Sequence, residues 1–198
     1  MKTTSIAILI SGSGSNAINI IQYFKQNDTI NVALLLSNNP NSKALKTAEK
    51  MAIKGCVFNN ESFKKKGELL SLLRSNGVDF VVLAGFLRKI PVEVVSFYKN
   101  KIVNIHPSLL PKYGGKGMYG MYVHRAVIDN KEDKSGISIH FVNDVYDEGG
   151  IIFQQSILVD AVDTPKSLAK KIQQLEHHHY PMIIESIIKT SVINNNEY

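Results

Sequence analysis

The chain of 198 residues contains a single cysteine, Cys56. One thiol cannot form an intramolecular disulfide, which excludes the class of disulfide-stabilised secreted domains. No apolar run reaches the roughly 18 residues of a membrane-spanning helix, and no hydrophobic signal peptide is present. These absences predict a cytoplasmic protein that does not enter a membrane. Cys56 lies in a short apolar segment, where we expect a buried, inert thiol.

The sequence also lacks the patterns of several binding classes. It has no zinc-finger, basic-zipper or ribonucleoprotein motif, so we expect no nucleic-acid partner. Its 23 basic and 17 acidic residues give a net charge of +6, which would attract either polyanions or phosphorylated small molecules. The lysine cluster at 64–66 fits an exposed helix start. The histidines at 177–179 lie inside a helical pattern, where adjacent residues point to different sides, so we expect no metal site there.

No repeat, low-complexity tract or linker divides the chain, and 44% of its residues are apolar. This length and composition fit one domain with a large core. Apolar runs predict strands at 5–10, 32–37, 55–58 and 78–84, and another run at 102–103. Helical patterns cover 17–24, 44–51, 68–74 and 92–97, with Pro91 in the first turn of the last one. Buried strands that alternate with helices imply a mostly parallel sheet covered on both faces.

The second half of the chain has a different pattern. Residues 135–142 and 151–157 alternate between apolar and polar side chains and predict an antiparallel hairpin. Helices are expected at 123–129 and 165–186. The hairpin loop at 143–150 carries three carboxylates beside two glycines, a composition that favours a solvated turn. The predicted fold class is therefore α/β, a mostly parallel twisted sheet with a carboxyl-terminal antiparallel hairpin.

A glycine-rich turn, Ser-Gly-Ser-Gly-Ser-Asn at 11–16, joins the first strand to the first helix. Such a turn lets backbone amides approach an anion at the positive end of the helix dipole, which predicts a phosphate site. It lacks the third glycine of the dinucleotide fingerprint and the Gly-Lys-Ser/Thr ending of the P-loop. A purely structural turn remains the alternative.

The segment Asn-Ile-His-Pro-Ser-Leu-Leu-Pro at 104–111 carries the most distinctive chemistry. Asn104 and His106 are two residues apart in an extended segment, so their side chains share a face and can address one atom. The prolines at 107 and 111 stiffen the backbone on both sides of Ser108. Ser108 lacks the context of a nucleophile elbow, so we expect a structural role for it. The alternative for His106 is an edge-strand histidine that caps a carbonyl.

Strand ends and loops place these features together. Ligands of parallel α/β sheets bind beyond the carboxyl ends of the strands. The loops at 11–16, 85–90 and 104–111 all follow predicted strands, so we expect them to form one site.

Four segments together resemble the folate-dependent formyltransferases, and among them those that act on phosphoribosylglycinamide. The segments are 11–16, 83–88, 104–111, and 136–142 with Asp147. The resemblance covers nearly the whole chain in order and implies a Rossmann-like formyltransferase fold in a single domain, 1–198. Residues 1–100 would form the phosphate-binding α/β half, and residues 101–198 would supply the catalytic loop, the hairpin and the last helix.

The resemblance also implies roles for individual residues. The catalytic trio would be Asn104, His106 and Asp147. The phosphate and ribonucleotide would be bound by Gly14, Ser15, Asn16 and Glu176. The folate would be bound by Leu87, Arg88, Lys89, Ile90, Asn104, Asn143, Asp144, Val145, Tyr146 and Asp147. His140 would support the site from its strand.

The chain departs from the family pattern in two places. The basic folate-side residue that precedes the third helix of the family has no clear counterpart, and one of Lys64, Lys65 and Lys66 is the candidate. The glycine-rich stretch at 113–122 is longer than the usual loop before His124 and is a candidate lid, or only a long connection.

The implied reaction transfers a formyl group from 10-formyltetrahydrofolate to the amine of 5′-phosphoribosylglycinamide in de novo purine biosynthesis, without a metal, in a monomer or homodimer. Asn104 and His106 would stabilise the oxyanion, and a His106 imidazolium held by Asp147 would protonate the departing folate nitrogen. Alternatives are formylation of another amine, such as an amino sugar nucleotide, hydrolysis of formyltetrahydrofolate, and a non-catalytic nucleotide-binding module. Formylation of methionyl-tRNA would need a further carboxyl-terminal domain.

Overall fold

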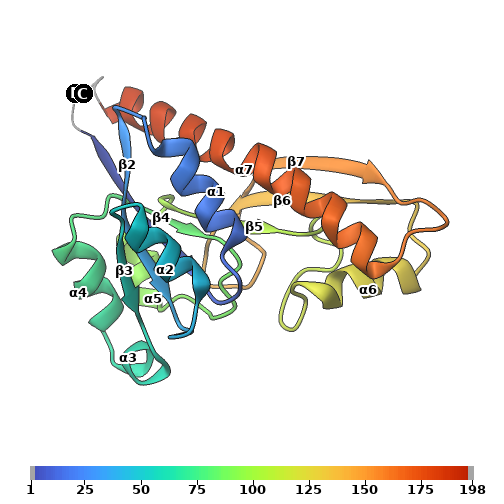
Figure 1. Ribbon diagram of the computed structural model, residues 1–198, viewed down its shortest axis with the longest axis horizontal. Coiled ribbons are helices and arrows are strands. Elements are labelled where there is room, and N and C mark those ends of the chain that lie inside the picture. The colour runs from blue at the N-terminus through green and yellow to red at the C-terminus, as the bar shows by residue number, and fades with distance from the viewer. Residues whose placement is uncertain (1–2, 196–198) are drawn as a thin grey trace.

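The computed structural model describes residues 3–195, apart from the side chains of Asn60, Lys64 and residues 192–195 (Figure 1). The strands are β1 (Thr4–Ile10), β2 (Ile30–Ser37), β3 (Lys54–Val57), β4 (Phe80–Leu83), β5 (Ile102–His106), β6 (Lys134–Phe141) and β7 (Ile151–Leu158). The helices are α1 (Ser15–Phe24), α2 (Lys43–Lys50), α3 (Asn60–Lys64), α4 (Glu68–Ser75), α5 (Val92–Phe97), α6 (Met121–Asp129) and α7 (Pro165–Asn195).

These strands form one sheet in the order β3-β2-β1-β4-β5-β6-β7. The first five strands in this order are parallel to one another, whereas β6 is antiparallel to both β5 and β7. The predicted mostly parallel sheet and the predicted hairpin are both confirmed. In the β5–β6 register, Asn104 lies opposite His140 and His106 lies opposite Ser138.

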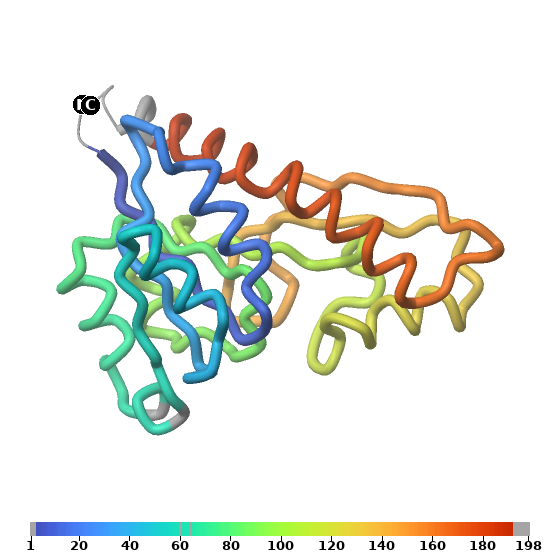
Figure 2. Tube along the Cα trace, viewed as in Figure 1, coloured from blue at the N-terminus to red at the C-terminus, as the bar shows by residue number. Residues whose placement is uncertain are grey.

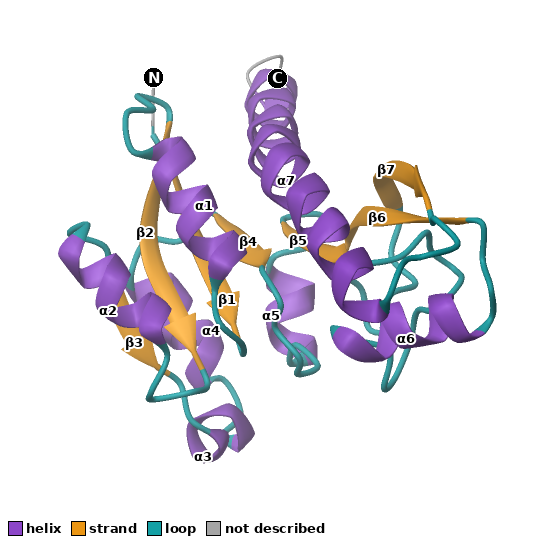
Figure 3. Ribbon diagram, turned by 45° about the vertical axis from the view of Figure 1, so that its right-hand side comes forward, coloured by secondary structure: helices purple, strands orange, loops and turns teal. Residues whose placement is uncertain are grey.

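Apolar side chains cover both faces of the sheet, as the continuous apolar runs of the parallel strands require. On β1, Ile6, Ile8 and Ile10 face the layer that contains α1, α2, α6 and α7, while Ala7 and Leu9 face the layer that contains α4 and α5 (Figure 3). Figure 2 shows the first and last helices side by side along the sheet. Within residues 3–195, no helix is long and apolar enough to cross a membrane.

The strand order reverses between β1 and β4, because the chain builds β2 and β3 on one side of β1 and then returns to build β4 on the other. The loops that leave β1 and β4 are joined there: the Ser11 amide donates to the Gly85 carbonyl at 3.0 Å, and the Leu87 amide donates to the Ser11 hydroxyl at 3.0 Å. Open α/β sheets bind ligands at such a reversal. The fold therefore places its binding crevice beside these two loops.

Two element predictions differ from the structure. The last helix continues past the predicted end at residue 186 to Asn195, because Ile184 and Ile188 keep an apolar stripe on the core. Pro91 lies at the N-cap of α5, one residue before the predicted first turn.

The segment between β3 and α4 also differs. Residues 60–64 form α3, which no pattern predicted; its start is fixed by Asn59, whose side chain accepts from the amides of Glu61 and Ser62. The lysine cluster therefore closes α3 instead of starting a helix. Cys56 is half-buried, not buried as expected, because β3 is an edge strand.

Gly149 offers a test of the hairpin loop. A Cβ added there would lie 1.7 Å from the Phe141 carbonyl oxygen, whereas a Cβ on Gly150 would meet nothing within 4 Å. We predict that Gly149→Ala lowers the free energy of unfolding by about 2–3 kcal/mol, because backbone must move to make room. Urea denaturation should show this loss, and Gly150→Ala, the matched control, should stay within about 0.5 kcal/mol of the parent. If Gly149→Ala destabilised the protein no more than Gly150→Ala does, the loop backbone could move to accommodate the added Cβ, and the prediction would be wrong.

Candidate active site

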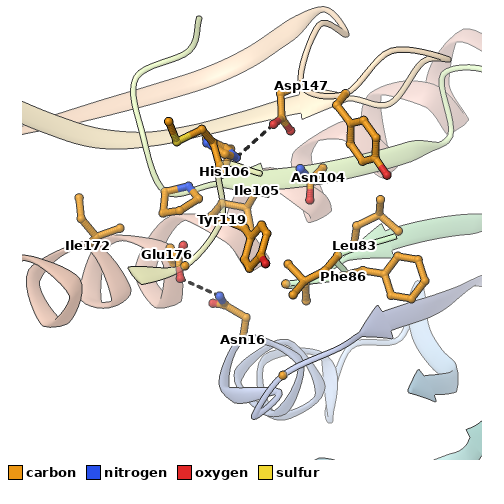
Figure 4. A pocket seen from close by; sticks show the side chains of 18 of the residues that line it. Asn16, Leu83, Phe86, Asn104, Ile105, His106, Tyr119, Asp147, Ile172 and Glu176 are labelled. Atoms are coloured by element: carbon orange, nitrogen blue, oxygen red, sulfur yellow. Dashed lines mark hydrogen bonds and ion pairs between the residues drawn. The ribbon is translucent and has the colours of Figure 1, made fainter. Parts of the chain in front are cut away.

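A cleft of about 840 Å³ lies where the loops after β1 and β4 meet β5. Its other walls come from residues 115–121, the loop between β6 and β7, and one side of α7. Figure 4 shows side chains from these segments pointing into a common space. The prediction that the loops after β1, β4 and β5 meet in one place is confirmed.

One end of the cleft is the amino terminus of α1. Gly14 has a φ of 75°, and a Cβ there would lie 2.4 Å from the Cβ of Ala44, so only glycine fits. No side chain caps the first turn of α1. Its amides and the positive end of the helix dipole are thus presented to the cleft beside Ser15 and Asn16, an arrangement that suits a phosphate group.

Helix α7 holds this end of the cleft from the opposite side. The Asn16 amide donates to Glu176 at 2.8 Å (Figure 4). The Gln173 amide donates to the Ser15 hydroxyl at 2.9 Å. Burial raises the pKa of Glu176 above its ordinary value, and the hydrogen bond from Asn16 opposes that rise. Glu176 is therefore placed to accept from a ligand hydroxyl in a partly dry environment.

At the centre of the cleft, His106 lies between a carbonyl and a carboxylate. Its Nε2 is 2.7 Å from the Tyr113 carbonyl oxygen, and its Nδ1 is 3.5 Å from Oδ2 of Asp147. A carbonyl oxygen can only accept, so Nε2 carries the ring proton. Nδ1 is then the nitrogen that can take a second proton, and it faces Asp147.

Asn104 and Asp147 are linked through His140. The Asn104 Nδ2 is 3.1 Å from Nε2 of His140, and the same Nε2 is 3.6 Å from Oδ1 of Asp147. The Phe141 carbonyl accepts from Nδ1 of His140 at 2.8 Å, which orients the ring. This geometry agrees with the supporting role expected for His140.

The electrostatics of the trio follow from burial and from these contacts. Burial lowers the pKa of His106 below its ordinary value, and the charge of Asp147 and the Tyr113 carbonyl oppose that shift only in part. Burial pushes the pKa of Asp147 upward, but the hydrogen bond from His140, the charge of His106 and the Gly115 amide together leave it below its ordinary value. The pair is thus a neutral imidazole beside a carboxylate at neutral pH. The expected imidazolium is not the resting form.

The other end of the cleft is formed by the loops that follow β4 and β6. It is lined by the predicted residues Leu87, Arg88, Lys89, Ile90, Asn143, Val145 and Tyr146. Asp144, predicted with them, does not line the cleft. Arg88 lies over the ring of Phe63 at 6.0 Å, which ties this wall to α3.

Of the three candidates for the missing basic residue, the two whose side chains are described do not reach this wall. Lys65 and Lys66 follow α3 and do not line the cleft, and the side chain of Lys64 lies outside the described part of the chain.

Ser108 is buried, and its hydroxyl donates to the Lys112 carbonyl at 2.6 Å, in agreement with its expected structural role.

The sequence left His124 without a role. It lies on α6 and lines the cleft; it is 5% exposed, and its Nδ1 has no hydrogen-bond partner among the described residues. Burial, with a smaller contribution from the charge of His106, lowers the pKa of His124 to about 4. The sequence did contain a sign that His124 is buried, because it lies on the same side of the α6 pattern as the apolar Val123 and Val127.

The comparisons with known proteins agree with this geometry. Residues 4–184 match the family described as Formyl transferase. The chain belongs to the formyl transferase family. No group of three or more His, Cys, Asp or Glu within residues 3–195 is arranged to hold a metal ion.

Individual relatives refine the match. The chain is 39% identical to the chloroplastic phosphoribosylglycinamide formyltransferase of Arabidopsis thaliana over 96% of its own length and 68% of that protein. It is 33% identical to the phosphoribosylglycinamide formyltransferase of Bacillus subtilis over 92% of its own length and 93% of that protein. The crystal structure of phosphoribosylglycinamide formyltransferase from Bacillus halodurans superposes with a TM-score of 0.86 at 33% identity, covering 95% of this chain and 97% of that one.

His124 predicts an acid-dependent loss of stability in this formyl transferase. The unfolded chain protonates this histidine near pH 6.5, whereas the folded chain does so only near pH 4. Stability is therefore lost as the pH falls from 6.5 toward 4, by about 2 kcal/mol between pH 7 and pH 5. Urea denaturation of His124→Gln should lack this component, while the exposed control His178→Gln should keep it. An unchanged pH dependence in His124→Gln would contradict the assignment.

Proposed function

We propose that this chain transfers the formyl group of 10-formyltetrahydrofolate to the amine of 5′-phosphoribosylglycinamide, a step of de novo purine biosynthesis. The observation that carries the proposal is the His106–Asp147 pair beside Asn104, in the same cleft as an uncapped helix terminus suited to phosphate. The names of the relatives support the same substrate.

The two substrates fit opposite ends of the cleft. The substrate phosphate takes the amides around Gly14, Ser15 and Asn16, and Glu176 accepts from a ribose hydroxyl. The folate ring system lies against the wall formed by residues 87–90 and 143–146. This arrangement brings the amine and the formyl carbon together near Asn104 and His106, so the protein supplies proximity before any chemistry occurs.

The reaction begins with attack by a neutral amine. An α-amino group has a reference pKa of about 7.7–8.0, so a useful fraction is neutral at pH 7 without a strong base. Attack forms the new carbon–nitrogen bond and places negative charge on the former formyl oxygen. The Asn104 amide, oriented by His140, is a preplaced donor for that oxygen; the loss of one such donor typically costs about 3–4 kcal/mol of barrier.

Collapse of the intermediate breaks the bond from carbon to N10 of the folate, and one proton must move from the attacking nitrogen to N10. Neutral His106 takes this proton at Nδ1, directly or through water, and Asp147 stabilises the imidazolium that results. The ring then delivers the proton to N10. No net proton is gained or lost by the enzyme, and no acyl-enzyme or metal is required.

Several further features belong to the proposal. Residues 1–198 act as one domain, in which residues 1–100 bind the phosphate and residues 101–198 supply the catalytic loop, the hairpin and the last helix. The glycine-rich residues 113–122 act as a lid over the cleft. We place the reaction in the cytoplasm, in a monomer or homodimer.

An activity assay tests the proposal. Folate absorbance is followed after the protein is mixed with 10-formyltetrahydrofolate, with and without phosphoribosylglycinamide. We expect turnover only with the amine, and a fall in kcat of at least about a hundredfold in His106→Ala, because the proton carrier is lost. His178→Ala, which removes an exposed imidazole outside the cleft, should leave kcat unchanged.

The other outcomes discriminate the alternatives. Equal loss of formyl groups without the amine would establish a hydrolase in place of a transferase. Turnover with an amino sugar nucleotide but not with phosphoribosylglycinamide would overturn the proposed substrate.

A further inference from the structure

Tyr113 has an uncommon backbone conformation next to the catalytic histidine. Its φ is +56°, in the left-handed region that non-glycine residues rarely adopt. In this conformation its carbonyl oxygen lies 2.7 Å from Nε2 of His106. Such outliers persist only where the surroundings hold them, and they concentrate at functional sites.

Glu132 holds the Tyr113 conformation from outside the cleft. The Tyr113 hydroxyl donates to Oε1 of Glu132 at 2.8 Å, and the Lys112 amine donates to both carboxylate oxygens at 2.9 and 3.0 Å. Hydrogen bonding from Lys112 lowers the pKa of Glu132 below its ordinary value, which keeps it an ionised acceptor at neutral pH. The Ser108 hydroxyl fixes the Lys112 carbonyl on the other side. Hydrogen bonds therefore hold both Lys112 and Tyr113 in place, and with them the Tyr113 carbonyl.

The position of that carbonyl decides which nitrogen of His106 carries the proton. Asp147 faces Nδ1, and the other titratable groups near the ring are His140 and His124. Among the described residues, none of these three hydrogen-bonds to Nε2; only the Tyr113 carbonyl does. Without this acceptor, the Asp147 carboxylate would favour a proton on Nδ1, because a carboxylate attracts an N–H and repels a lone pair.

We infer that Tyr113 and Glu132 are positioning residues that keep the proton of neutral His106 on Nε2, and so leave Nδ1 open to accept a proton beside Asp147. The expected effect on kcat rests on the proposed function, whereas the expected tautomer of His106 does not. Neither side chain needs to touch a substrate. Their effect on catalysis passes through the Tyr113 carbonyl.

Tyr113→Phe tests the inference, because it keeps the ring that packs on the core and removes only the hydroxyl. Tyr23→Phe is the matched control: it removes a similar bond of 2.7 Å, from a tyrosine hydroxyl to Glu185, outside the cleft. The tautomer of His106 is read from its ¹⁵N chemical shifts above pH 8, and kcat and both KM values are measured in parallel.

We expect the parent and Tyr23→Phe to show His106 with the proton on Nε2 alone, and Tyr113→Phe to show a substantial Nδ1–H population. In Tyr113→Phe, kcat should fall about fivefold, the factor for one hydrogen bond, while both KM values change less than about twofold. An unchanged tautomer and an unchanged kcat in Tyr113→Phe would overturn the inference.

Glu132→Ala provides a second route to the same effect, since it removes the acceptor in place of the donor. It should shift the tautomer in the same direction, and the double variant with Tyr113→Phe should lose no more kcat than Glu132→Ala alone. Fully additive losses would contradict a shared mechanism. If the parent shows the Nε2 tautomer but no formyl transfer, the proposed function fails while the positioning by Tyr113 stands.

Discussion

The site depends on one partly buried carboxylate, that of Asp147, which lies between two histidines and one backbone amide. Its oxygens are 3.5 Å from His106 and 3.6 Å from His140, and the Gly115 amide donates to it at 2.9 Å. Asp147 itself has a φ of +57°, a strained conformation that the hairpin loop maintains. Burial raises the pKa of Asp147, and these contacts more than offset that rise, so its pKa lies below its ordinary value. A neutral side chain there would leave the imidazolium of His106 uncompensated.

The antiparallel hairpin adds His140 and Asp147 to the cleft in which the parallel part of the sheet forms the anion site. Parallel strands and their helix termini supply an anion site at the strand-order reversal, a common arrangement in α/β folds. They supply no acid beside β5. The register of β6 places His140 opposite Asn104, and the loop that follows β6 carries Asp147 back to His106. The anion site and the proton-transfer groups are therefore built by different halves of the chain and meet in one cleft.

The sequence predicted the elements and the central motif well, because apolar periodicity and the order of loops after strands are local properties. It did not predict the contacts that join distant segments, such as Asn16 with Glu176, 160 residues apart. Nor did it predict the left-handed Tyr113, which only the surrounding contacts stabilise, or the exposure of Asp144 next to lining residues. The neutral resting state of His106 depends on burial, which a motif does not reveal.

A pH titration of the His106 ring by NMR measures how burial and Asp147 together set the His106 pKa, and it requires no substrate. We expect a His106 pKa below 6.5 in the parent chain and a still lower pKa in Asp147→Asn, since the carboxylate charge raises that pKa. A parent pKa above 6.5, or a pKa that rises in Asp147→Asn, would contradict a neutral resting imidazole stabilised on protonation by Asp147.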